Sequence, residues 1–238
     1  GGYTALSSGN IQDFTFDGFS AQAQSTSSTG TCLSTSSRGG NVVKNMIMTG
    51  VSTSFGVGLT LNGAMTKVRN CLITGLLRGV ATGSFTYGSL FANNTVVGNG
   101  TGIYAEGSGA STYGKYYNNA VFGNTTNWSR AAPAAVEGAS KNTGESGDAI
   151  AAWAVGAGST SVTITSADFA DYAGGDFRPA SALSALFDAG TDYYGRLSTD
   201  LAGDEVPNYN NGDAEGIDIG CFEFDNGYGP HPASHTLT

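Results

Sequence analysis

Short apolar segments recur along the first half of the chain, each led by asparagine and followed by glycine or asparagine. Four of them are led by Asn45, Asn70, Asn94 and Asn119, which follow one another at a nearly constant interval. A fixed period of roughly 20 to 50 residues is typical of a solenoid, because each repeat buries its apolar face only against its neighbours. The pattern therefore predicts stacked coils of about 25 residues.

A second series of glycine-led apolar pairs runs in phase with the first, at Gly56-Val57, Gly79-Val80 and Gly102-Ile103, again with equal spacing. A coil of this length holds about three short strands at ~3.3 Å per residue. The leucine-rich-repeat pattern is absent, and no sustained 3.6-residue period indicates helices. We predict an all-β, right-handed parallel β-helix over residues 1–141, with an early turn that begins at Asp13 and stacks below Asn45.

Side-chain parity within the strands predicts two apolar columns, because residues i and i+2 share a face. We assign one column to the interior: Ile47, Leu72, Val96 and Val121. The other should point outward: Met48, Ile73, Val97 and Phe122. An outward apolar stripe indicates a covered surface, under a loop or tail of the same chain or under another subunit. The second alternative makes the outward column an oligomer interface. The leading asparagines should stack at a bend and bond along the stack.

Composition narrows the function classes. The formal net charge of −9, with only ten Lys and Arg, disfavours binding to nucleic acid. No apolar stretch approaches the ~20 residues that span a bilayer. The three cysteines, Cys32, Cys71 and Cys221, are irregularly spaced and accompanied by two histidines, so a structural zinc site is not expected. Cys71 lies in an apolar strand, where a buried free thiol is expected.

Two parts of the chain resemble known β-helix proteins. Asn93–Ile103 is similar to the repeat of pectate-lyase-like right-handed parallel β-helices, a likeness that extends over residues 11–127. Asp168–Pro179, Ser184–Gly190 and Asp218–Glu223 resemble the terminal part of "choice-of-anchor Q" β-helix proteins, although Pro179 replaces the usual apolar residue. Residues 226–238 have no apolar periodicity, so we expect an exposed tail there. The resemblance to these β-helix proteins implies a closing section, which we place at residues 142–225 and expect over the last coil. It also implies a bacterial surface or phage virion protein.

The resemblance implies that enzymes of this fold mostly cut polysaccharides with carboxylates from neighbouring coils. The candidates in the repeat region are Asp13, Asp17 and Glu106. Glu106 lies several coils from the other two, too far at ~4.8 Å per coil to form a carboxylate pair. We therefore expect no intramolecular catalytic site, no metal and no cofactor.

The closing section contains an alternating segment, Ser161–Thr165, that predicts a strand, and two loose groups of acids. The acids are Asp168, Asp171 and Asp176, and then Asp200, Asp204, Glu205, Asp213 and Asp218. No EF-hand spacing is present among them. We expect these side chains to form turns and to pair with arginine, with Arg178 opposite Asp188 or Asp218.

Aromatic residues gather in or near the turns of the later coils: Tyr104, Tyr113, Tyr116, Tyr117 and Trp128. They suit either a glycan-binding groove or packing within the loops. The leading hypothesis is a non-enzymatic, extracellular structural or adhesive protein, a phage virion component such as a decoration or tail-spike-type module. By analogy it would be a homotrimer in contact with other virion or cell-surface proteins. The alternatives are a polysaccharide-binding or polysaccharide-degrading protein (spike depolymerase or secreted enzyme) and a bacterial surface adhesin.

Overall fold

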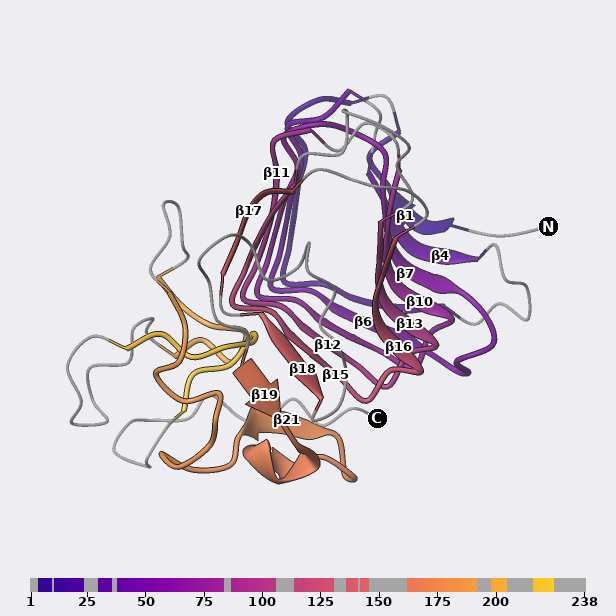
Figure 1. Ribbon diagram of the computed structural model, residues 1–238. Helices are drawn as coiled ribbons and strands as arrows, with labels where there is room; N and C mark the ends of the chain where they lie inside the picture. Colours follow the sequence, from indigo (N-terminus) through magenta and orange to yellow (C-terminus); the bar gives the residue numbers. More distant parts are fainter. Residues whose placement is uncertain are drawn as a thin grey trace.

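The computed structural model shows a parallel β-helix, as the repeat predicts (Figure 1). It describes residues 4–9, 11–23, 30–35, 38–83, 87–105, 114–130, 136–140, 142–145, 162–191, 198–204 and 216–224. No helix in these ranges is long and apolar enough to span a membrane.

Three parallel sheets form the walls of the solenoid. Sheet A contains β1 (Thr4–Ser7), β4 (Thr31–Ser34), β7 (Val57–Leu61), β10 (Arg78–Thr82), β13 (Thr101–Ala105) and β16 (Thr126–Arg130). Sheet B contains β2 (Thr15–Asp17), β5 (Val42–Lys44), β8 (Lys67–Arg69), β11 (Ser89–Ala92), β14 (Gly114–Tyr117) and β17 (Val136–Ser140). Sheet C contains β3 (Ser20–Ala23), β6 (Ile47–Gly50), β9 (Leu72–Thr74), β12 (Thr95–Val97) and β15 (Ala120–Phe122).

Two small strand pairs follow the solenoid. Strand β18 (Thr143–Glu145) pairs in parallel with β19 (Val162–Ile164), the strand that the alternating pattern predicts. Strand β20 (Phe169–Asp171) pairs antiparallel with β21 (Asp176–Pro179), after a single 3₁₀ turn, η1 (Ser166–Asp168).

The predicted side-chain columns are out of register by one residue from β12 onward. Ile73 pairs with Val96 rather than with Val97, and Val96 pairs with Val121. The interior column is therefore Met48, Ile73, Val96 and Val121, all fully buried in the solenoid core. Because side chains alternate in a strand, a slip of one residue exchanges the two faces. The assignment of Met48 and Ile73 to the outward face is wrong, as is that of Ile47 and Leu72 to the interior.

The leading asparagines also belong to two columns instead of one. The corner column (Asn45, Asn70, Asn93 and Asn118) follows the sheet-B strands, and its backbone φ angles lie between 51° and 53°. Asparagine is one of the few non-glycine residues that adopts this left-handed conformation readily. The first coil has Gly18 at this place, with φ of 73°. Gly18, and not Asp13, is thus the equivalent of Asn45.

The inner ladder (Asn94, Asn119 and Asn142) begins one residue further along and lies inside the solenoid. Nδ2 of Asn94 donates to Oδ1 of Asn119 over 2.9 Å, and Nδ2 of Asn119 donates to Oδ1 of Asn142 over 2.9 Å. Asn94 also donates to the carbonyl of Val68, which satisfies a backbone group at the bend. The predicted structural role of Asn94 and Asn119 is confirmed.

The glycine-led pairs line sheet A, with one correction. Val80 pairs with Ile103 as predicted, but its partner in β7 is Leu59, so Gly58-Leu59 takes the place assigned to Gly56-Val57. A Cβ at Gly79 would lie 2.7 Å from the carbonyl oxygen of Gly102, and a similar clash occurs at Gly58. Glycine is therefore required where neighbouring coils approach closely.

The closing section, meaning here residues 162–191, 198–204 and 216–224, lies beside the solenoid (orange to yellow in Figure 1). Its apolar residues form a second core with the outward side chains of sheet C, among them Val97 and Phe122. It therefore packs on a lateral wall across several coils, and the prediction that it packs over the last coil is wrong in that respect. The predicted exposed tail at 226–238 lies outside the described residues.

Candidate functional site

Two of the three predicted catalytic acids, Asp13 and Asp17, fall on described residues. Asp17 lies on β2, where its carboxylate forms an ion pair with Lys44 at 3.0 Å and accepts a hydrogen bond from Asn45. Asp13 lies before β2 with a positive φ of 56°. Glu106 lies outside the described residues.

The predicted binding aromatics divide into core and surface residues. Tyr116 and Trp128 are buried in the solenoid core, where Tyr116 stacks on Phe91 at 5.1 Å, so a glycan cannot reach them and their prediction as binding residues is wrong. Tyr104 is half-buried on the outer face of sheet A, with the Arg78 guanidinium 4.2 Å from its ring centroid. Tyr117 is half-buried at the end of β14, and Tyr113 lies outside the described residues.

The four predicted interface residues are all buried within one chain. Met48 and Ile73 lie in the solenoid core, whereas Val97 and Phe122 face outward beneath the closing section. Of the two covers that the sequence left open for the outward stripe, the structure shows a segment of the same chain. The trimer itself stays a prediction, which these side chains no longer support.

The closing section covers an outer stripe on sheet C, formed by Leu72, Val97, Ala120 and Phe122. Against this stripe pack Ile164, Phe169, Phe177, Leu186, Ile219 and Cys221. Phe122 makes a tilted contact with Phe169, with ring centroids 5.5 Å apart, and an edge contact with Tyr172 at 5.1 Å. A solvated face of sheet C would carry polar side chains at these positions, so the apolar outer stripe is typical of a covered surface.

The corner column ties the closing section to the solenoid. Asn70 donates its Nδ2 to the carbonyl oxygen of Thr199 over 2.6 Å, and Asn93 donates to that of Asp218 over 3.0 Å. Asn118 donates to the carbonyl of Thr191 over 2.9 Å and accepts from the same residue's N–H over 2.8 Å. Each of three successive coils thus binds one of three closing loops, 186–191, 198–204 and 216–224.

Three buried carboxyl groups accept backbone hydrogen bonds in these closing loops: Asp200, Asp218 and Glu223, each at most 4% exposed. Those of Asp200 and Asp218 join one loop to another. Asp200 accepts from the N–H groups of Gly203 and Glu223, over 2.7 and 2.8 Å. Asp218 accepts from the N–H of Asp188 over 2.7 Å and from that of Phe224. Glu223 in turn accepts from the N–H of Asp218 over 3.3 Å.

Burial governs the electrostatics of this carboxyl group cluster. It raises the pKa of Asp200 to about 6 and that of Asp218 to about 7, because a buried charge loses its hydration. The pKa of Glu223 is also raised, first by burial and then by the negative charge of Asp218. Backbone hydrogen bonds oppose these shifts without cancelling them.

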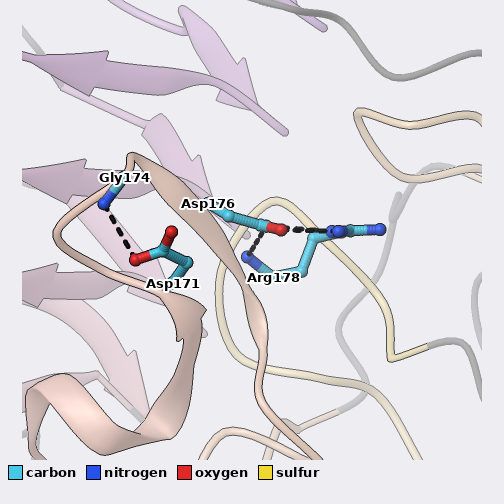
Figure 2. A network of polar contacts seen from close by, with 4 residues as sticks. All are labelled: Asp171, Gly174, Asp176 and Arg178. Atoms are coloured by element: carbon cyan, nitrogen blue, oxygen red, sulfur yellow. Dashed lines mark hydrogen bonds and ion pairs between the residues drawn. The ribbon is translucent and has the colours of Figure 1, made fainter.

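The exposed acids of the closing section form local turns, as predicted. Figure 2 shows the β20–β21 hairpin, in which Asp171 accepts from the N–H of Gly174 over 2.9 Å. Arg178 pairs with Asp176 on the same strand, and its Nε donates over 2.9 Å. Asp218, expected opposite Arg178, instead accepts backbone hydrogen bonds. Among the described residues, no group of three His, Cys, Asp or Glu is arranged to hold a metal ion.

The outer face of sheet B carries a concentration of positive charge. Its outward side chains include Lys44, Lys67, Arg69 and Lys115, and Lys44 stands directly opposite Arg69 on the next strand. Like charges in directly opposed positions are destabilising in a sheet. Asp17, directly opposite Lys44 on β2, pairs with one of these charges, and the remaining bases make this face a basic wall on an acidic chain.

Comparison with protein-family models, with curated proteins and with solved structures finds no match for this chain. The resemblance to pectate-lyase-like and "choice-of-anchor Q" proteins thus stays an expectation. That resemblance draws attention to the Asp218–Glu223 segment, but it does not indicate that Asp218 and Glu223 are buried together. Nor does the sequence pattern separate Asn93 and Asn118 from the asparagines that follow them.

Proposed function

We propose that the chain is a non-enzymatic structural or adhesive protein that acts outside the cell, as a component of a phage virion. The virion part of this proposal rests on the resemblance of the sequence, and one observation carries the non-enzymatic part. The buried carboxyl groups of Asp200, Asp218 and Glu223 accept backbone hydrogen bonds that hold loops together, so the acids most shielded from water have structural partners. Acids that flank a glycosidic bond need instead to face a substrate.

The solenoid supports a load-resisting or surface-presenting role. Its three sheets run through the described coils from β1 to β17, and the inner ladder bonds successive coils side chain to side chain. Such quasi-one-dimensional stacking makes a stiff rod with extended flat walls.

Two measurements test this proposal. Purified protein incubated with a panel of bacterial polysaccharides should generate no new reducing ends, and release of oligosaccharides would contradict a non-enzymatic role. Antibodies against the chain should label extracellular particles in fractions from the source culture. Labelling confined to the cytoplasm would contradict the virion assignment.

A second candidate function, binding of an acidic polysaccharide, is favoured by the basic wall on sheet B. Lys67 is exposed, and Lys115 lies two strands away in the same outward column, with Leu90 between them. Affinity electrophoresis in gels containing polygalacturonate should then retard the protein, and less so after Lys67→Glu. An equal effect of the control Arg130→Glu, an exposed base on sheet A, would refute the assignment to sheet B.

A further inference from the structure

The interface between the closing section and sheet C combines three features that separate it from the rest of the molecule. It buries the outer stripe, it is tied by one corner asparagine per closing loop, and its loops are joined through carboxyl groups. The described contacts between loop 198–204 and loop 216–224 include the bond from the N–H of Glu223 to Asp200 and that from Leu201 to the carbonyl of Cys221. The titratable carboxyl groups therefore lie where one closing loop bonds to another.

We propose that the closing section is a pH-gated cover: it is held on the outer stripe while Asp200, Asp218 and Glu223 are protonated, and it loosens from sheet C as they ionise. The proposal stands on the placement of these three side chains, which are buried in the closing loops and whose described hydrogen bonds come from backbone N–H groups. It goes beyond the proposed function, and it holds equally for a virion protein and for a glycan-binding one.

Other ionisable groups lie around the cluster. Asp188 and Asp204 in the closing loops add negative charge near Asp218 and Asp200, respectively. Cys221 and Cys71 contribute thiols whose pKa values are raised by burial, so they stay neutral. On the solenoid side, Arg69 and Tyr117 are the titratable residues that directly precede Asn70 and Asn118 in the sequence.

The direction of the pH effect follows from the linkage between proton binding and opening. Each buried carboxyl group binds a proton more tightly in the closed state than in an opened, hydrated one, so a rise in pH favours opening. A pKa of about 7 for Asp218 in the closed state, against an ordinary value of 3.8, predicts that opening becomes about 100-fold more favourable between pH 5 and pH 8. Because the three groups repel one another when charged, their protons are lost in successive steps that belong to the cluster as a whole.

Opening can be followed through Cys221, a free, buried thiol that contacts the outer stripe and donates its backbone N–H to Oγ1 of Thr95 over 3.0 Å. Cys32 and Cys71 are equally buried but belong to the solenoid core, so they report on the rod itself. Iodoacetamide labelling of each cysteine, resolved by peptide mass spectrometry, therefore separates opening of the cover from unfolding of the solenoid.

The experiment measures each labelling rate relative to the same cysteine in urea-unfolded protein at the same pH, which removes the pH dependence of thiol reactivity. We expect the relative rate of Cys221 to rise by about 100-fold or more between pH 5 and pH 8, while Cys32 and Cys71 stay protected. A flat profile for Cys221 would overturn the proposal. So would a parallel rise at all three cysteines, because it would show that the solenoid unfolds as well.

Charge-neutral variants test the groups themselves. Glu223→Gln keeps an acceptor for the N–H of Asp218 and removes one charge, so the rise at Cys221 should be smaller than in the unmodified protein. Asp218→Asn serves as a second variant in case Gln at 223 packs poorly. The matched control is Asp171→Asn, which removes an exposed charge from the same section and should leave the full rise intact. A full rise in both neutral variants would overturn the assignment to this cluster.

Discussion

The solenoid and the closing section differ first in charge. Residues 1–141 contain eight Lys and Arg against four Asp and Glu, whereas residues 142–225 contain two against fifteen. The solenoid holds its coils by backbone ladders and neutral asparagine amides, and the closing section holds its loops by buried carboxyl groups. Neutral amides bond in the same way at any ordinary pH, but carboxyl groups do not. The two regions should therefore respond differently to pH, although they share an interface.

The largest expected effect comes from truncating the contact between the two regions. Phe122→Ala removes a ring that packs on Phe169 and Tyr172 and should lower the free energy of unfolding by about 3 kcal/mol. Chemical denaturation monitored by circular dichroism measures this loss. The matched control is Phe19→Ala, because Phe19 is 55% exposed and should cost less than about 1 kcal/mol. Equal losses for the two would mean that the closing section contributes little.

The sequence was sufficient to predict the fold, but not to predict which side chains of each strand face the interior. The recurrence of asparagine-led apolar segments predicted stacked coils, but the doublets Asn93-Asn94 and Asn118-Asn119 made it ambiguous which asparagine leads. Coil length varies as well, because Lys67 pairs with Val42 in the coil before and with Leu90 in the coil after, at unequal separations along the chain. A uniform period placed Asn94 beside Asn70, and the backbone conformation, which a sequence does not display, places Asn93 there.

The candidate site was less predictable for a physical reason. Acidic residues and an outward apolar stripe were visible in the sequence, and so was the alternative that the chain covers itself. Which wall the closing section occupies depends on contacts between residues that are distant in sequence, such as Asn118 with Thr191 and Asn93 with Asp218. No local pattern encodes such pairings. The raised pKa values of Asp200 and Asp218 follow from the burial that these contacts produce, so the sequence could not predict them either.

The second effect concerns the inner ladder. Asn119→Leu should cost about 2–3 kcal/mol, because it leaves buried polar partners of Asn94 and Asn142 unpaired inside the solenoid. Thermal unfolding at pH 5 and at pH 8 should show the same loss, since no ionisable group takes part. A loss that depends strongly on pH would contradict the distinction between the two regions.

The third effect is the pH dependence of overall stability. Asp200, Asp218 and Glu223 have raised pKa values in the folded protein, so their contribution is fully present below the ordinary carboxyl range and is lost as pH rises through about 6 to 7. For Asp218 alone the loss between pH 5 and pH 8 amounts to roughly 2.6 kcal/mol. Urea titrations across this range measure it. Stability that increases from pH 5 to pH 8 would contradict a neutral buried cluster.

The smallest effect isolates a single tie between the regions. Asn118→Gly preserves the left-handed backbone and removes the side chain that binds Thr191, so we expect a loss of about 1 kcal/mol. Asn45→Gly is the matched control, since Asn45 has the same backbone conformation but bonds to Asp17 on the solenoid. Only Asn118→Gly should raise the relative labelling rate of Cys221. A similar rise in both variants would show that the corner column acts through the backbone alone.

Hydrogen exchange of individual backbone amides at pH 5 and pH 8, corrected for intrinsic exchange rates, tests the separate titration of the cover most directly. The N–H groups of Gly220 and Cys221 bond across the interface, to the carbonyl of Asn118 and to Thr95. Those of Thr95 and Ala120 bond from one coil of the solenoid to the preceding one, to the carbonyls of Cys71 and Asn94. We predict that protection of Gly220 and Cys221 falls at pH 8 while that of Thr95 and Ala120 is unchanged. Uniform protection at both pH values, or a fall shared by all four amides, would contradict a separately titrating cover.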